Sequence, residues 1–184
     1  MKFFQSIKGQ AYGLGQIDKI LPLVKDDEDT VAVERGSCLI MTANGDGEPI
    51  FKRATDATSL TGGARVFFSL HAEDDSQAGM AGTVGGNPVI GGLDCGADGE
   101  FETEMYDAVK DYVVNQYLTV DANSKLTPVT DVTKGTVDIV GQVTKAPATR
   151  WRNEVASGTA LKTGGNVTYL TYKAMWLPSE TIET

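Results

Sequence analysis

Residues 117–147 read YLTVDANSKLTPVTDVTKGTVDIVGQVTKAP and decide the fold class. In the second half of this stretch, apolar or small residues alternate with polar ones, which is the period-two pattern of a strand with one buried face. Residues 121–125 supply side chains that bond to their own backbone in turns, Lys134-Gly135 precedes the alternating run, and Pro147 is expected to end it. The stretch therefore predicts β-strands joined by tight turns. The alternating residues are Val137, Ile139, Gly141 and Val143 on one face, and Thr136, Asp138, Gln142 and Thr144 on the other.

Further strands are predicted on both sides of this stretch. The segment NGDGEP (44–49) is the strongest hairpin signal, because Asn-Gly and Asp-Gly supply positive-φ positions at little cost. It joins a strand SCLIMT (37–42) to a return strand at 50–53. ARVFFSL (64–70) alternates as a strand does. NVTYLTYKAMW (166–176) carries apolar residues on both faces, so both of its faces must be covered.

Two segments are harder to assign from their pattern. The glycine-rich residues 71–99 predict a long loop around a short strand PVIGG (88–92). In residues 100–117, apolar spacing close to that of a helix competes with strand-like alternation in the first half of the segment. We predict a strand up to Tyr106, followed by at most a short helix.

Residues 1–24 differ from the rest of the chain. They are rich in apolar side chains, but three glycines and Pro22 interrupt any regular helical face. Two arrangements fit this pattern equally well: an arm laid across a neighbouring molecule, or an edge strand on the protein's own core. On the first, the chain divides into an N-terminal arm at 1–24 and a β-rich domain at 25–184.

Length and charge narrow the class of protein. A chain of 184 residues suggests one domain with a core of its own. A net charge of −9 with scattered basic residues disfavours binding to a phosphate backbone. No run approaches the roughly 18–20 consecutive apolar residues of a membrane span, and the first ten residues break their apolar run too early for a secretory signal. We expect a soluble protein without nucleic-acid or membrane partners, with Cys38 and Cys95 reduced.

Catalytic and metal-binding patterns are weak throughout. His71 is the sole histidine and lies in a predicted loop, so no Ser-His or Cys-His nucleophile is expected. The glycine runs lack the spacing of phosphate-binding or dinucleotide motifs. Three acidic sets could hold calcium or act as acid–base pairs, but turn formation, solvation and a solvated strand face explain them better. We predict no catalytic, cofactor-binding or metal-binding residue. The sets are Asn44, Asp46 and Glu48; Asp94, Asp98 and Glu100; and Glu100, Glu102 and Glu104.

The stretch 117–147 resembles the later strands of the head-decoration, or cement, proteins of tailed bacteriophages. In that family a YLTVD…KLTP hairpin leads to a strand that ends in a VG-V-TKAP-like element, and this chain has both. The resemblance implies a mostly β, single-domain barrel or sandwich, with the β-tulip-type decoration fold as the specific case. It also implies a non-enzymatic virion protein, made in the host cytoplasm, that binds the major capsid protein on the capsid surface, often as a trimer.

Large apolar side chains supply the predicted partner contacts, because aromatic residues dominate the cores of interfaces. These contacts are Phe3, Phe4, Tyr12, Leu14 and Ile17 in the arm, and Trp151, Tyr172 and Trp176 near the C-terminal end.

Two other functions remain open. A small β-barrel enzyme or ligand-binding module would place its site in the 71–99 loop and use its acidic side chains. A tail-tube or fibre-base component would account for residues 1–30 and the 71–99 loop, which have no counterpart in the resemblance. The acidic side chains of the loop are Asp74, Asp75, Asp94 and Asp98.

Overall fold

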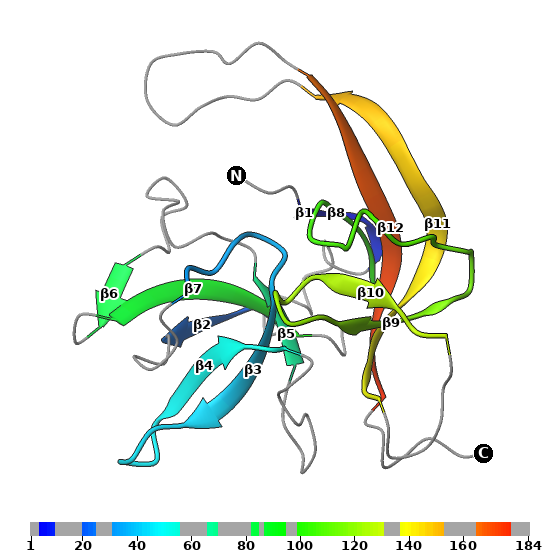
Figure 1. The fold of residues 1–184 in the computed structure, drawn as a ribbon. Helices are drawn as coiled ribbons and strands as arrows, with labels where there is room; N and C mark the ends of the chain where they lie inside the picture. Colours follow the sequence, from blue (N-terminus) through cyan, green and yellow to red (C-terminus); the bar gives the residue numbers. More distant parts are fainter. Residues whose placement is uncertain are drawn as a thin grey trace.

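The computed structural model shows two antiparallel β-sheets and, in the residues that it describes, no helix (Figure 1). The prediction of a mostly β protein is confirmed. The described residues are 4–9, 20–24, 31–55, 66–69, 82–84, 87–94, 99–130, 137–152 and 165–177.

The first sheet is built around the two longest strands of the described residues. Strand β12 lies between β8 and β11, and the hairpin β9–β10 extends the sheet beyond β11. In spatial order the strands are β1 (Phe4–Gly9), β8 (Gly99–Thr103), β12 (Gly165–Leu177), β11 (Ile139–Arg152), β9 (Tyr117–Val120) and β10 (Leu126–Pro128).

The second sheet is strongly curled. Its end strands β2 and β4 contact each other, although no ladder of hydrogen bonds joins them among the described residues. The described strands therefore do not show a closed barrel. In spatial order they are β2 (Ile20–Val24), β7 (Asn87–Asp94), β5 (Val66–Ser69), β3 (Cys38–Ala43) and β4 (Pro49–Arg53), with β6 (Gly82–Val84) paired to β7.

The two described pieces of the N-terminal segment are edge strands of the protein's own sheets. Strand β1 pairs antiparallel with β8, so that Phe4 lies opposite Thr103. Strand β2 pairs with β7, so that Leu23 lies opposite Ile90. These two pieces therefore pair as the edge-strand alternative predicts, and residues 1–3 and 10–19 lie outside the described part. Edge strands can be held by main-chain bonds on one side, which suits a segment whose glycines and proline prevent a helix.

The two predicted hairpin turns are confirmed by their side-chain geometry. In the first turn, Asn44 Oδ1 accepts hydrogen bonds from the backbone N–H of Asp46, at 3.0 Å, and of Glu48, at 2.8 Å. In the second, Asp121 Oδ1 accepts from the N–H of Asn123, at 2.8 Å, and of Lys125, at 2.9 Å. Each turn therefore satisfies two of its own backbone donors with a side chain from within the turn.

In the glycine-rich segment 71–99, the strand predicted at 88–92 is confirmed and is longer than predicted, and a further short strand, β6, pairs with it. Strand β7 is eight residues long, pairs with β2, β5 and β6, and contains Gly91 and Gly92 in its interior. Glycine weakens an isolated strand, but pairing on both sides supplies hydrogen bonds that the composition does not reveal. The prediction of a loop is corrected only for residues 82–84, 87 and 93–94, and residues 71–81, 85–86 and 95–98 lie outside the described part.

Strand β11 does not end at Pro147. It continues to Arg152, and its register with β12 shifts between Val143 and Lys145 and again between Lys145 and Ala148. Pro147 lies at the second shift, where a β-bulge leaves one residue outside the regular ladder. A proline is tolerated at a bulge because its missing N–H interrupts no regular bond there.

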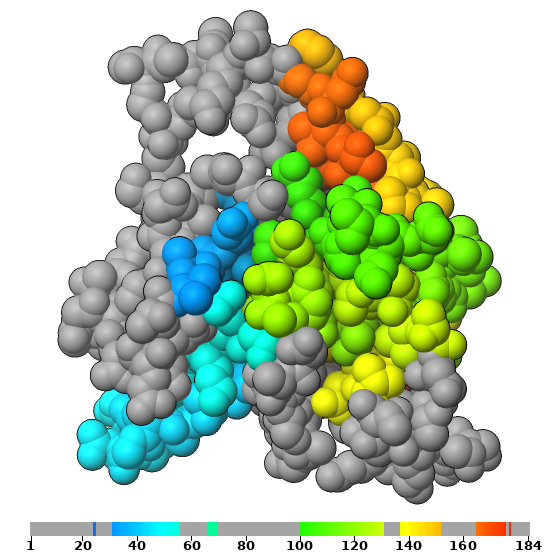
Figure 2. Space-filling view, in the orientation of Figure 1, coloured from blue at the N-terminus to red at the C-terminus, as the bar shows by residue number. Residues whose placement is uncertain are grey.

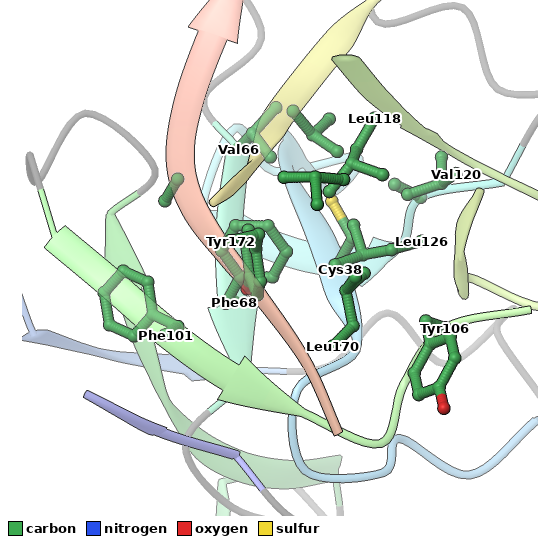
Figure 3. Packing of buried hydrophobic residues seen from close by; sticks show 14 of the residues in the cluster. Cys38, Val66, Phe68, Phe101, Tyr106, Leu118, Val120, Leu126, Leu170 and Tyr172 are labelled. Carbon is green, nitrogen blue, oxygen red and sulfur yellow. The ribbon is translucent and has the colours of Figure 1, made fainter. Parts of the chain in front are cut away.

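The main core lies between the two sheets (Figure 3). Tyr172 of β12 is fully buried, with its ring centroid 5.4 Å from that of Phe68 in the second sheet and 5.9 Å from that of Phe101 in the first. The prediction of a subunit contact at Tyr172 is therefore corrected, since a side chain with 0% exposure packs within its own chain. A second, smaller cluster on the opposite face of the second sheet contains Val33, Leu39, Phe51 and Phe67.

A single buried hydroxyl links the β9–β10 turn to the second sheet. Ser124 is 1% exposed, and its Oγ donates a 2.6 Å hydrogen bond to the carbonyl oxygen of Ala54, which directly follows β4. We expect Ser124→Ala to lower the free energy of unfolding by about 1–3 kcal/mol, because the buried carbonyl loses its donor. Urea unfolding measures this change. Thr149→Ala is the control, because it also removes a hydroxyl that is hydrogen-bonded, to Thr168 at 2.8 Å, but at an exposed site where water replaces the bond; it should change the stability by less than about 0.5 kcal/mol. Equal effects of the two substitutions would contradict the prediction.

Candidate interaction surface

One loop gathers much of the exposed apolar surface of the described residues. Val109, Val113 and Val114 are 88%, 66% and 50% exposed, and all three lie in residues 107–116, here called the valine loop. Figure 2 shows this part of the chain, in green, on the surface facing the viewer. Single exposed apolar residues are common, but three within six positions form a local patch.

The first half of the valine loop is held by a buried tyrosine. Tyr112 is 7% exposed, and its hydroxyl lies 2.9 Å from the carbonyl oxygens of both Asp107 and Leu126. Its ring packs edge-on against Tyr106, with centroids 5.5 Å apart. Burial, and then the negative charge of Asp107, raise the pKa of Tyr112, so the hydroxyl stays protonated and remains a donor.

The second half of the loop is bonded to β11. The N–H of Asn115 donates to the carbonyl oxygen of Val143 at 2.8 Å, and the N–H of Val143 donates back to Gln116 at 2.9 Å. The side-chain amide of Gln142 donates to the Asn115 carbonyl at 3.0 Å. Asn115 itself has φ of 71°, a conformation that asparagine tolerates better than most residues. The valine loop is thus fixed at both ends while its valines face outward.

The helical alternative for this segment is not formed. The spacing of Val109, Tyr112 and Val113 is close to that of a helix face, and it suggested that these side chains share one buried side. In the structure only Tyr112 is buried, and turns replace the helix. The spacing does not indicate which of the three side chains is buried.

A second exposed feature is the outer part of the β11–β12 hairpin. Residues 148–152 pair with 165–169, beyond the stretch of β12 that β8 covers, and we call this part the ribbon (Figure 1). Trp151 lies on the ribbon and is 65% exposed, which leaves it accessible for the contact predicted there. The other predicted contacts give no test: Trp176 and Phe4 lie on β12 and β1, but their side chains fall outside the described part of the structure, as do Phe3, Tyr12, Leu14 and Ile17 entirely.

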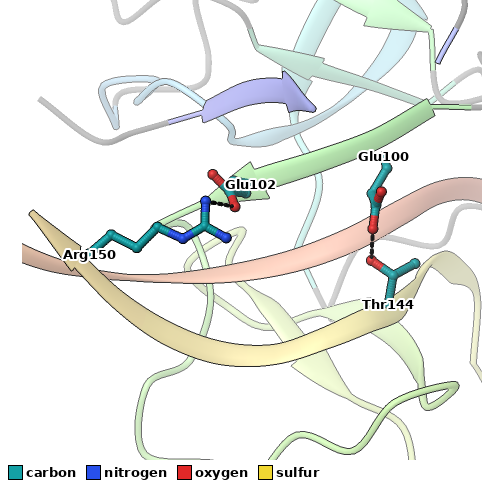
Figure 4. A network of polar contacts seen from close by, with 4 residues as sticks. All are labelled: Glu100, Glu102, Thr144 and Arg150. Carbon is teal, nitrogen blue, oxygen red and sulfur yellow. Dashed lines mark hydrogen bonds and ion pairs between the residues drawn. The ribbon is translucent and has the colours of Figure 1, made fainter. Parts of the chain in front are cut away.

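The acidic run on β8 is buried rather than solvated. Glu100 is 6% exposed and Glu102 is 2% exposed, so the prediction of a solvated strand face is corrected. The Oγ1 of Thr144 donates a 2.6 Å hydrogen bond to Glu100, and Arg150 forms a 2.7 Å ion pair with Glu102 (Figure 4). Both partners come from β11, which is not adjacent to β8 in the sheet. Contacts that reach across an intervening strand leave no signal in the local sequence pattern.

The remaining candidate groups can be placed only in part. Asn44 and Glu48 are bonded to each other within their turn, with Asn44 Nδ2 donating to Glu48 at 3.1 Å. Across the described residues, no group of three or more His, Cys, Asp or Glu side chains is arranged to hold a metal ion. Cys38 is buried, and burial raises the pKa of its thiol. The side chains of His71, Asp74, Asp75, Asp94, Cys95 and Asp98 lie outside the described part.

The described part of the chain contains no helix with the length and hydropathy needed to cross a membrane.

Comparison with known proteins identifies no relative: no family model, no curated protein and no solved structure matches this chain.

Proposed function

We propose that this protein is a structural virion protein that binds the outside of an assembled phage capsid and stabilises it. Two observations support the proposal. The stretch 117–147 resembles phage head-decoration proteins, and the valine loop presents apolar side chains from a rigid base. The loop is the observation that carries the proposal, because it is a surface suited to a protein partner.

Rigidity decides how useful the valine loop is for binding. Ordering a flexible segment on association costs free energy. A loop that is already bonded at both ends in the folded protein has lost this conformational freedom before it binds. The loop is held by Tyr112 at one end and by the bonds between residues 115–116 and β11 at the other. Burial of its valines on a partner therefore contributes to affinity with little ordering cost.

The proposed partner is the major capsid protein, through an apolar depression on its outer surface. The valine loop carries Asp107 and Asp111 against Lys110, and the chain as a whole carries a net charge of −9, so a basic rim around the depression would complement it. The resemblance implies a trimer on the capsid and no enzymatic activity.

Charged substitutions in the valine loop test the proposal. Burial of one valine contributes roughly 1.5–3 kcal/mol, so we expect the double variant Val109→Asp/Val113→Asp to bind undecorated capsids at least ~100-fold more weakly. Co-sedimentation of purified protein with undecorated capsids measures this affinity.

Val31→Asp is the matched control, because Val31 is an exposed valine outside the loop, at 51% exposure. Val31→Asp should bind capsids as tightly as the unsubstituted protein does. Both variants should melt within a few degrees of the unsubstituted protein. Unchanged binding of the double variant would remove the loop from the interface. Failure of the unsubstituted protein to bind any capsid would overturn the proposed function.

A further inference from the structure

We propose that Arg150 is a positioning residue. Its ion pair with Glu102, here called the latch, restrains the ribbon against the sheet and thereby fixes the position of Trp151. The inference concerns the ribbon within this chain, so it does not depend on the identity of the partner. Where Trp151 contacts the capsid, the latch would determine the angle of that contact.

The ribbon extends beyond the rest of the sheet. Strand β8 pairs with β12 from Leu170 to Lys173, and among the described residues β11 and β12 pair only with each other beyond Tyr169. A two-stranded hairpin is marginally stable in water by itself. A ribbon of this length therefore needs side-chain contacts with the body to keep one orientation.

Strand β11 bends where the ribbon begins. Two register shifts fall between Val143 and Ala148, and bulges of this kind bend a strand and increase its twist. Thr144 lies at the first shift and Arg150 lies beyond the second. Both side chains reach across β12 to β8, at Glu100 and Glu102. One contact therefore lies at the start of the bend and the other lies beyond its end (Figure 4).

The two charges of the ion pair are unequally buried. Glu102 is 2% exposed, whereas the side chain of Arg150 is 52% exposed. A buried carboxylate is costly without a cation beside it, and the ribbon supplies that cation. Moving the ribbon outward would withdraw the guanidinium from the carboxylate, so the burial of Glu102 is coupled to the position of the ribbon.

Trp151 follows Arg150 directly on β11 and points to the opposite face. Successive side chains of a strand point to opposite faces, so Arg150 on the face of Glu102 places Trp151 on the other face. On that face Trp151 is 65% exposed. The arginine that holds the ribbon and the indole that it presents are therefore neighbours in sequence with opposite roles.

Hydrogen exchange of the ribbon amides tests the latch. In Arg150→Gln, we expect exchange in peptides covering 148–152 and 165–169 to rise about tenfold or more, as local opening becomes easier. A peptide covering β9 and β10 should keep its exchange rate. Glu102→Gln should resemble Arg150→Gln, and Arg150→Lys, which keeps the charge, should recover part of the protection.

Lys145→Gln is the matched control, because it removes the same charge from an exposed position of the same strand. It should leave the ribbon protected. A folded Arg150→Gln protein with unchanged ribbon exchange would overturn the proposal, and so would equal increases in the ribbon and in β9–β10.

If Arg150→Gln does not fold, the unsubstituted protein still decides the question. The Arg150 end of the pair is half exposed and open to screening, so raising the salt from about 0.05 M to about 1 M should selectively speed exchange in the ribbon. No salt effect on the ribbon would overturn the latch. None of these measurements uses capsids, so their outcome is independent of the proposed function.

Discussion

Tyr172→Ala is expected to lower the free energy of unfolding by about 3–5 kcal/mol, the range for removing a large buried aromatic side chain. Tyr172 is completely buried and packs against Phe68 from the second sheet and Phe101 from the first. Its loss would open a cavity between the two sheets, where neither sheet can move to fill it without disturbing its own strand pairing. Urea unfolding followed by circular dichroism measures the effect.

Tyr172→Phe is the control for this substitution, because it keeps the ring and should cost less than about 1.5 kcal/mol. A residue that serves mainly at a subunit contact would behave differently: its alanine variant would lose assembly and keep the stability of the monomer. A loss below about 1 kcal/mol for Tyr172→Ala would contradict the core role that the structure assigns.

Gly141→Val is expected to lower the free energy of unfolding by about 1–3 kcal/mol or more, the usual cost of overpacking a core. A Cβ atom at Gly141 would lie 2.9 Å from Cδ2 of Tyr172 and 3.1 Å from the carbonyl oxygen of Lys173. The ring is fully buried and the carbonyl belongs to the paired strand β12, so neither can move freely. Thermal unfolding measures the shift.

Gly45→Val is the matched control, since a Cβ at Gly45 meets nothing within 4 Å. We expect its melting temperature to fall much less than that of Gly141→Val. If the two variants melt together, the close approach at Gly141 does not limit the packing of β11 on β12.

The hairpins could be predicted from the sequence because their causes are local. Asn44 and Asp121 each accept two hydrogen bonds from backbone N–H groups within the next four residues, and the residues that do so are adjacent in the chain. Strand alternation is local in the same sense. It placed β5 and the start of β11, whereas the hairpin signal at 44–49 placed β3 and β4.

In the valine loop, the local sequence does not determine which side chains are buried. The spacing of Val109, Tyr112 and Val113 was compatible with a helix face, yet only Tyr112 found partners, namely the carbonyls of Asp107 and Leu126. Leu126 belongs to β10, so its position depends on the pairing of strands. The exposure of the valines therefore follows from tertiary structure, and with it the best candidate interaction surface.

The sequence by itself determined that this chain forms strands and turns, because alternation and turn chemistry act over a few residues. The tertiary structure alone decided which polar groups are buried. Glu100 and Glu102 alternate with apolar residues as a solvated face would, but the bend in β11 brings Thr144 and Arg150 onto them from more than forty residues away. It also decided the role of Tyr172, because a strand with apolar residues on both faces does not specify which face meets the second sheet. Burial depends on what packs against a strand, and that partner is distant in the chain.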